Sequence, residues 1–393
     1  MREYLLVFLV AAAATYLLTV IAREIALRTG AVAAVRDRDV HAEPTPYLGG
    51  LAMLGGLGAA YVVAQRLPFL SENGGPLVFH DARTVLIAGT MICAVGVLDD
   101  LFELDALTKL GGQVLAAGFL VLNGIQYFYV PSGHGGQLSL DAAQGALLTA
   151  FVIVATINAV NFVDGLDGLA AGVVGIGAVA FFLFCYQLTS LNQTSLASTG
   201  ALLSAMLGGA CLGFLPHNVN PARLFMGDSG SMLIGLVLSA SAITLTGQFS
   251  GTELSKGAMG TPASLAPTFL PLALPVTLLV VPIADLVLAV IRRTRAGRSP
   301  FSPDKQHLHH RLLEIGHSQR RAVLIMWMWA ALVAGSTVVI SLYTGPLMWS
   351  SIAVATVLAV GLTFLLPKLR RPGAAAAVPL AVPRGPEDSS PGT

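Results

Sequence analysis

The chain alternates long apolar runs with short polar segments along almost its whole length. A run of about 20 apolar residues is long enough for a helix to cross the hydrocarbon layer of a membrane. The sequence therefore predicts eleven transmembrane helices, with the third short for a bilayer and the fifth running into a polar motif. The predicted helices cover residues 4–22, 48–65, 84–98, 107–123, 143–160, 168–188, 198–216, 229–247, 269–291, 323–342 and 348–366.

The polar segments predict the orientation of the chain. With the N-terminus outside, the inner loops hold 18 of the 22 Lys and Arg residues. Cytoplasmic loops carry this excess of positive charge, so the C-terminus is expected in the cytoplasm. The first run could be mistaken for a signal peptide, but it lacks a clear small-residue cleavage site and is interpreted as retained. The expected location is the cell membrane, with several crossings.

Composition excludes a soluble protein, because 55% of the residues are hydrophobic, 11% are charged and the mean hydropathy is +0.75. We expect an all-α polytopic membrane protein with one transmembrane domain over residues 1–366. Residues 367–393 are rich in Ala, Pro and Gly without aromatic residues, which predicts a disordered tail. The three cysteines fall inside apolar runs, which indicates packing rather than disulfides. The net charge of +1 gives no indication of nucleic-acid binding.

A polar stretch, Asn158-Ala-Val-Asn-Phe-Val-Asp-Gly-Leu-Asp-Gly, separates the fifth and sixth runs. If it is helical, Asn161 lies beside Asp164 and Asp164 beside Asp167, because residues three apart are neighbours on a helix. Two adjacent carboxylates need a metal ion, a basic side chain or a metal-bound diphosphate to offset their repulsion. The alternative is that these aspartates only cap the following helix.

Two further acidic motifs stand at the ends of predicted helices. Asp99 and Asp100 follow the third run and point about 100° apart on a helix, so they can serve different partners, with Lys109 nearby. Asp228 lies between Gly227 and Gly230 at the start of the eighth run. The alternatives are that the pair merely ends one helix and that Asp228 is the N-cap of the next.

The segment 292–317 is basic and rich in histidine. His307, His309 and His310 lie beside Lys305 and Arg311, a setting that favours an anion such as a diphosphate over zinc. Asp285, within the ninth run, is interpreted as a structural partner of a basic side chain. Gly49 and Gly50 allow close backbone approach or simply begin a helix.

The predicted topology brings these motifs, from the Gly-Gly segment to the histidines, to the cytoplasmic side, and the outer loops carry no comparable cluster. Surplus aspartates beside a basic loop fit Mg²⁺-assisted chemistry on a nucleotide substrate. Such chemistry needs positioning and charge neutralisation more than covalent work by the protein. A reactive face at a membrane implies a lipid reactant.

Together these motifs resemble the polyprenyl-phosphate N-acetylhexosamine-1-phosphate transferases over residues 20 to 366, and most closely the actinobacterial decaprenyl-phosphate branch. The resemblance implies transfer of a sugar 1-phosphate from a UDP-sugar to a polyprenyl phosphate, with release of UMP. It implies Mg²⁺, or Mn²⁺, as the cofactor, and a homodimer is left open. The site residues that it implies are Asp99, Asp100, Asp228, His307, His309 and His310 for catalysis, Asn158, Asn161, Asp164, Asp167, Phe225, Lys109 and Arg311 for substrate, and Asp228, Asp164 and Asp100 for metal.

Within this family, the loop His307-Leu-His-His-Arg311 lacks an unbroken histidine run, which favours UDP-N-acetylglucosamine over a muramoyl-pentapeptide substrate. The product would begin a cell-envelope glycan such as an arabinogalactan linker, teichoic acid or O-antigen. A transporter is the alternative from another class, but it should show broken helices near the midplane and repeated halves. A CDP-alcohol phosphotransferase would also use aspartates and Mg²⁺, but its sequence pattern is absent.

Overall fold

A computed structural model describes residues 1–32, 45–131, 137–192, 198–246, 294, 318–342 and 345–365 of the chain. Helices dominate this part of the molecule. They are α1 (Arg2–Thr29), α2 (Gly49–Ala64), α3 (Pro68–Phe102), α4 (Ala106–Leu122), α5 (Ala142–Val163), α6 (Leu169–Asn192), α7 (Ser198–Asn218), α8 (Gly227–Thr246), α12 (Gln319–Leu342) and α13 (Pro346–Leu365). The all-α prediction missed one short antiparallel hairpin, formed by β1 (Tyr129–Pro131) and β2 (Gln137–Ser139).

Eight of the described helices are long and apolar enough to cross a membrane, and α2 and α4 are shorter apolar helices. These eight and two helices match ten of the eleven predicted runs, so the chain is a polytopic helical membrane protein. The ninth run, 269–291, and the tail, 367–393, lie outside the described residues.

The third helix is longer than the sequence suggested, and the prediction of a short helix over 84–98 is wrong. α3 spans 35 residues, bends at Gly75, where φ is 66°, and is apolar enough to cross a membrane from Gly74 to Phe102. The predicted run began at position 84, after several polar residues. The structure instead keeps them in the helix, with Asp81 only 3% exposed. Asp99 and Asp100 therefore lie in the last turns of α3.

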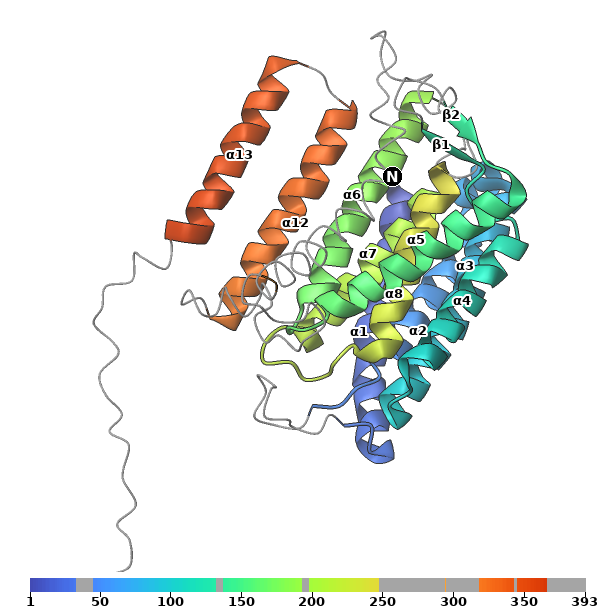
Figure 1. The fold of residues 1–393 in the computed structure, drawn as a ribbon, viewed down its shortest axis with the longest axis vertical. Coiled ribbons are helices and arrows are strands. Elements are labelled where there is room, and N and C mark those ends of the chain that lie inside the picture. Colours follow the sequence, from blue (N-terminus) through green and yellow to red (C-terminus); the bar gives the residue numbers. More distant parts are fainter. Residues whose placement is uncertain are drawn as a thin grey trace, which may run out of the picture.

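The two most enclosed helices are α7 and α8. Buried residues make up 83% and 94% of their apolar segments, compared with 22% and 17% for α12 and α13. α7 packs against α1 and α6, whereas α8 packs against α3 and α5. α12 and α13 form a pair at one edge of the molecule, with α12 beside α6 (Figure 1). The start of α8 is therefore surrounded by other helices.

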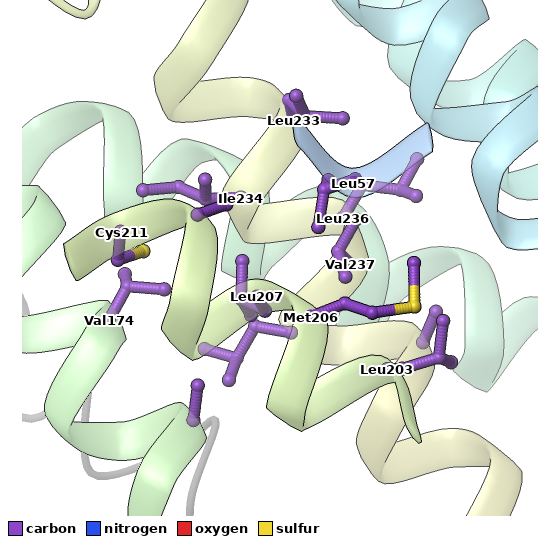
Figure 2. Close-up of a cluster of buried hydrophobic side chains, with 14 of the residues drawn as sticks. Leu57, Val174, Leu203, Met206, Leu207, Cys211, Leu233, Ile234, Leu236 and Val237 are labelled. Carbon is purple, nitrogen blue, oxygen red and sulfur yellow. The ribbon is translucent and has the colours of Figure 1, made fainter. Parts of the chain in front are cut away.

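Apolar side chains from four helices fill the space around α7 and α8 (Figure 2). Met206 and Leu207 of α7 meet Val237 of α8, with Leu57 of α2 and Val174 of α6 on either side. In a membrane this close packing holds helices together, because lipid tails are as apolar as the side chains. The packed centre fixes the position of α8 and of the aspartate at its start.

Candidate active site

The first turn of α8 is capped by an aspartate from another helix. The backbone N–H groups of Asp228 and Ser229 donate to Asp100 Oδ1 and Oδ2, at 2.8 and 3.3 Å. Such N–H groups at a helix start have no partner within the helix, so the Asp100 carboxylate satisfies them. Gly227 has a φ of 71°, and a side chain there would collide with this carboxylate. Asp100, not Asp228, is therefore the cap of α8.

The Asp228 carboxylate is held by two neighbouring helices. Lys109 Nζ of α4 lies 3.0 Å from Asp228 Oδ2, and Asn161 Nδ2 of α5 donates to Asp228 Oδ1 at 2.8 Å. Asn161 also donates to Ser231 Oγ at 3.0 Å. Lys109 Nζ lies 2.7 Å from Asp99 Oδ2, so one ammonium group bridges two carboxylates. Of the adjacent pair, Lys109 therefore contacts Asp99 and not Asp100.

The turn between α3 and α4 positions Lys109. Asp99 Oδ1 accepts a hydrogen bond from the backbone N–H of Leu104 at 2.8 Å, which closes the turn after α3. Asp105 caps α4 by accepting from the N–H groups of Leu107 and Thr108, each at 2.9 Å. A hydrogen bond from the Thr108 hydroxyl lowers the pKa of Asp105. Asp99 and Asp100 serve different partners, as their helical spacing predicts.

Close backbone contacts fix the start of α8 between α2 and α3. A Cβ atom added at Gly96 of α3 would overlap the backbone of Ser229, and one added at Gly50 of α2 would overlap that of Gly230. The N–H groups of Gly49 and Gly50 donate to the carbonyls of Phe225 and Met226, which precede α8, each at 3.1 Å. The Gly-Gly segment therefore makes the close approach that its sequence suggested.

Phe225 is half-buried at this junction. Its N–H donates to the carbonyl of Pro46 at 2.8 Å, and its ring centroid lies 6.0 Å from that of Tyr47. The backbone of Phe225 is thus fixed, while its ring stands beside the entrance to α8.

Asp164 ends α5 and is the least restrained of the clustered aspartates. It is half-buried, and its carboxylate accepts no hydrogen bond from the other described residues. Withdrawal from water, together with the nearby charges of Asp228, Asp100 and Asp167, raises the pKa of Asp164 to about 7. The helical arrangement considered for this stretch does not apply to Asp164 and Asp167, because α5 ends at Val163 and α6 begins at Leu169, as the separate runs 143–160 and 168–188 predicted.

Asp167 lies in the turn between α5 and α6 and binds a loop of the protein itself. Its Oδ2 accepts hydrogen bonds from Asn220 Nδ2 and from the N–H of Ala222, both at 3.0 Å. Beside it, Asn218 accepts from the N–H of Gly168 at 2.9 Å and donates to the carbonyl of Leu224 at 3.0 Å. These contacts join the turn to the loop that leads into α8.

Asn158 was predicted to contact substrate, and the structure places its amide against Gln113 of α4. Asn158 Nδ2 donates to Gln113 Oε1 at 2.6 Å. Gln113, Gly96, Ser231 and Asn220 also belong to this region, although they are not part of the motifs predicted from sequence. The position of Gln113 could have indicated a contact between helices, since an amide inside an apolar helix usually forms a hydrogen bond to a neighbouring helix.

The remaining predicted site residues, His307, His309, His310 and Arg311, lie outside the described residues, as does Asp285. Among the residues that the structure describes, no three His, Cys, Asp or Glu side chains are arranged to hold a metal ion by themselves. The described site therefore groups four carboxylates, those of Asp99, Asp100, Asp164 and Asp228, and the Lys109 ammonium group bridges two of them, Asp99 and Asp228.

Comparison with known proteins shows the family to which the chain belongs. A family model described as "Glycosyl transferase family 4" matches residues 82–246. The chain is 46% identical over 374 residues to the decaprenyl-phosphate N-acetylglucosaminephosphotransferase of Mycobacterium tuberculosis. The matched region covers 94% of this chain and 90% of the relative.

Two more distant relatives carry different names. The probable undecaprenyl-phosphate N-acetylglucosaminyl 1-phosphate transferase of Bacillus subtilis is 30% identical over 368 residues, covering 91% of this chain and 90% of the relative. The phospho-N-acetylmuramoyl-pentapeptide-transferase of Desulforudis audaxviator is 34% identical over 303 residues, covering 72% and 80%. The chain belongs to the polyprenyl-phosphate N-acetylhexosamine-1-phosphate transferases of glycosyl transferase family 4, the group that its motifs resemble.

Proposed function

We propose that this protein transfers N-acetylglucosamine 1-phosphate from UDP-N-acetylglucosamine to a polyprenyl phosphate. An oxygen of the lipid phosphate forms a bond to the phosphorus next to the sugar. The bond between that phosphorus and the oxygen bridging to the uridine-bearing phosphate breaks, and UMP leaves with that oxygen. The product is a polyprenyl diphosphate that carries the sugar.

The observation that carries this proposal is the cluster of four aspartates at the start of α8, in which Lys109 bridges only Asp99 and Asp228. A nucleotide diphosphate would bring further negative charge, so a cation must accompany it. Carboxylate oxygens are the ligands that Mg²⁺ prefers, and Mg²⁺ usually takes one or two of them together with water and phosphate oxygens. The donor set therefore fits Mg²⁺, or Mn²⁺, which would neutralise charge on the phosphoryl group during transfer.

The contacts of each aspartate suggest how the roles divide. Asp228 and the unrestrained Asp164 would hold the ion, since both Asp100 oxygens already accept backbone N–H groups. Lys109 can turn from Asp99 and Asp228 towards a phosphate oxygen, and Asp99 would then orient the lipid phosphate. Phe225 would stack on the uracil, and His307, His309, His310 and Arg311 would bind the diphosphate.

We further propose eleven transmembrane helices, an outside N-terminus and a site on the cytoplasmic face. Support comes from arginines around the loop before α8. Arg23 Nε donates to the carbonyl of Arg223 at 3.3 Å, and Arg320 Nε donates to that of Asn220 at 2.8 Å. Arginines gather on the cytoplasmic side of membrane proteins, so this end of the bundle is expected to face the cytoplasm.

The choice of N-acetylglucosamine rests on the relatives. Those named for N-acetylglucosamine reach 46% identity and cover 94% of the chain, whereas the relative named for the muramoyl-pentapeptide reaches 34% and covers 72%. The test is purified protein with Mg²⁺, decaprenyl phosphate and radiolabelled UDP-sugars, read as lipid-linked label and UMP. UDP-N-acetylglucosamine should support transfer and UDP-N-acetylmuramoyl-pentapeptide should not. Efficient use of the muramoyl substrate would overturn the assignment.

A further inference from the structure

The three helices that hold Asp228 meet again one helical turn deeper in the molecule. Gln113 lies four residues after Lys109 on α4, and Asn158 lies three residues before Asn161 on α5. Residues three or four apart lie on the same helix face, so this second set lies directly behind the first. Met232, four residues after Asp228 on α8, completes it. We name Gln113, Asn158 and Met232 the amide layer.

The two amides of this layer are paired with each other. Asn158 Nδ2 donates to Gln113 Oε1 at 2.6 Å, and Gln113 Nε2 donates back to Asn158 Oδ1 at 3.4 Å. Gln113 Nε2 also approaches Met232 Sδ at 3.7 Å, and Asn158 Nδ2 donates to the carbonyl of Val154 at 2.8 Å. The Gln113 side chain is buried, so its amide has little access to water.

Of the two amides, Gln113 is buried and Asn158 is exposed, so separating the pair would leave the Gln113 amide without this partner and without access to water, which is costly. The pair therefore restricts both the distance and the rotation between α4 and α5. Lys109 and Asn161 belong to these same two helices, and each contacts a different carboxylate oxygen of Asp228. A shift of α4 relative to α5 would pull the two side chains off Asp228.

We propose that Gln113 is a positioning residue that acts through Asn158 to keep Lys109 and Asn161 in place around Asp228. Asn158 then contributes to the reaction through the protein rather than by touching substrate. In its kinetic part this inference rests on the proposed function. Displacement of a site group by about 1 Å can slow an enzyme about 100-fold, so a remote pair of amides can matter for turnover.

The kinetic test uses four variants: Gln113→Leu, Asn158→Leu, their double, and an exchange that combines Gln113→Asn with Asn158→Gln. Each leucine variant should lower kcat about tenfold or more while KM for UDP-N-acetylglucosamine changes less than about twofold. The double variant should have the same kcat as either single variant, because each single change already breaks the Gln113–Asn158 pair. The exchange keeps an amide pair of the same total length and should recover most of the activity.

Gln144→Leu is the matched control, since Gln144 is an amide at the far end of α5, in a capping box with Asp141. It should leave kcat and KM unchanged. The proposal is overturned if Asn158→Leu raises KM while Gln113→Leu has no effect, which would make Asn158 a substrate ligand. It is also overturned if the exchange is as slow as the single variants.

A second readout does not depend on activity. Lys109 contacts two carboxylates, which should slow the acetylation of its amine. Gln113→Leu should raise the acetylation rate of Lys109 about fivefold by mass spectrometry, and Gln144→Leu should not. An unchanged rate would overturn the positioning role. If wild-type protein transfers no sugar phosphate, the proposed function fails, yet this rate still decides whether Gln113 positions Lys109.

Discussion

The turn between α5 and α6 holds two aspartates in the same local sequence, Asp-Gly, and the fold gives them opposite surroundings. Asp167 accepts two hydrogen bonds from the loop before α8, at 3.0 Å each. Asp164, three residues earlier, faces other carboxylates and has a pKa raised to about 7. Asp167 connects two parts of the protein, whereas Asp164 is expected to bind a cation.

The same contrast separates Asp100 from Asp228. Asp100 accepts backbone N–H groups, which belong to a rigid helix start and have no alternative partner. Asp228 is held by the side chains of Lys109 and Asn161, which can turn towards a ligand. An aspartate bound by backbone is expected to support the structure, and one bound by side chains or facing other acids is expected to bind ligand.

The largest effect is expected from Asp228→Asn. A neutral amide attracts a divalent ion far less than a carboxylate does, and its NH₂ group would face Lys109 or Asn161. The variant should lose activity on the order of 1000-fold and lose Mg²⁺-dependent binding of UDP-sugar. Calorimetric titration with and without Mg²⁺ measures the binding, and Asp141→Asn at the far end of α5 is the control. Normal Mg²⁺-dependent binding would move the metal site to Asp99, Asp100 or Asp164.

Asp164→Asn is expected to reduce activity about 100-fold without loss of stability. The amide removes one charge from a crowded acidic cluster, so the folded protein should be as stable as wild type or more so. The measurements are transfer rate and Tm in detergent. A clear fall in Tm would show that Asp164, like Asp167, supports the structure.

Much of this arrangement can be predicted from sequence because membrane proteins obey strong constraints. The apolar runs predicted the ten described helices. The alternation of inner and outer loops also predicted that Asp99, Asp100 and Asp228 lie on the same face. The adjacent pair at 99 and 100 was also correctly expected to serve two partners, since helix geometry alone determines that divergence.

The specific partners could not be predicted. Asp100 caps a helix that begins 127 residues later, and only tertiary packing brings the two together. Asp164 and Asp167 would be neighbours on a helix, but α5 ends at Val163 and α6 begins only at Leu169, so the turn gives the two side chains different surroundings. The amide of Gln113 lies within an apolar run, but its partner Asn158 is 45 residues away, so the pairing could not be predicted.

The raised pKa of Asp164 predicts how cation binding depends on pH. The carboxyl group must lose its proton before it can bind a cation, and in the folded protein this occurs near pH 7. Below pH 7, Mg²⁺ affinity should therefore rise with pH by up to about tenfold per unit, and above pH 7 it should level off. Titration of Mn²⁺ followed by electron paramagnetic resonance between pH 5.5 and 8.5 measures this. Asp164→Asn should flatten the profile, and an equally steep profile in that variant would assign the proton to another group.

The smallest effect on turnover is expected from Asp167→Ala. In contrast to Asp164→Asn, this change should lower Tm more clearly than it lowers turnover. Removing the carboxylate leaves Asn220 Nδ2 and the N–H of Ala222 without this acceptor, which costs about 1–3 kcal/mol and should lower Tm. The loosened loop leads into Phe225, so KM for the UDP-sugar should rise while kcat of the folded enzyme falls less than about tenfold. Asn220→Ala is the matched variant and should give the same shifts, with no further loss when the two changes are combined. If Asp167→Ala instead abolishes turnover at unchanged Tm, Asp167 contacts the substrate, and the two aspartates of the turn share one role.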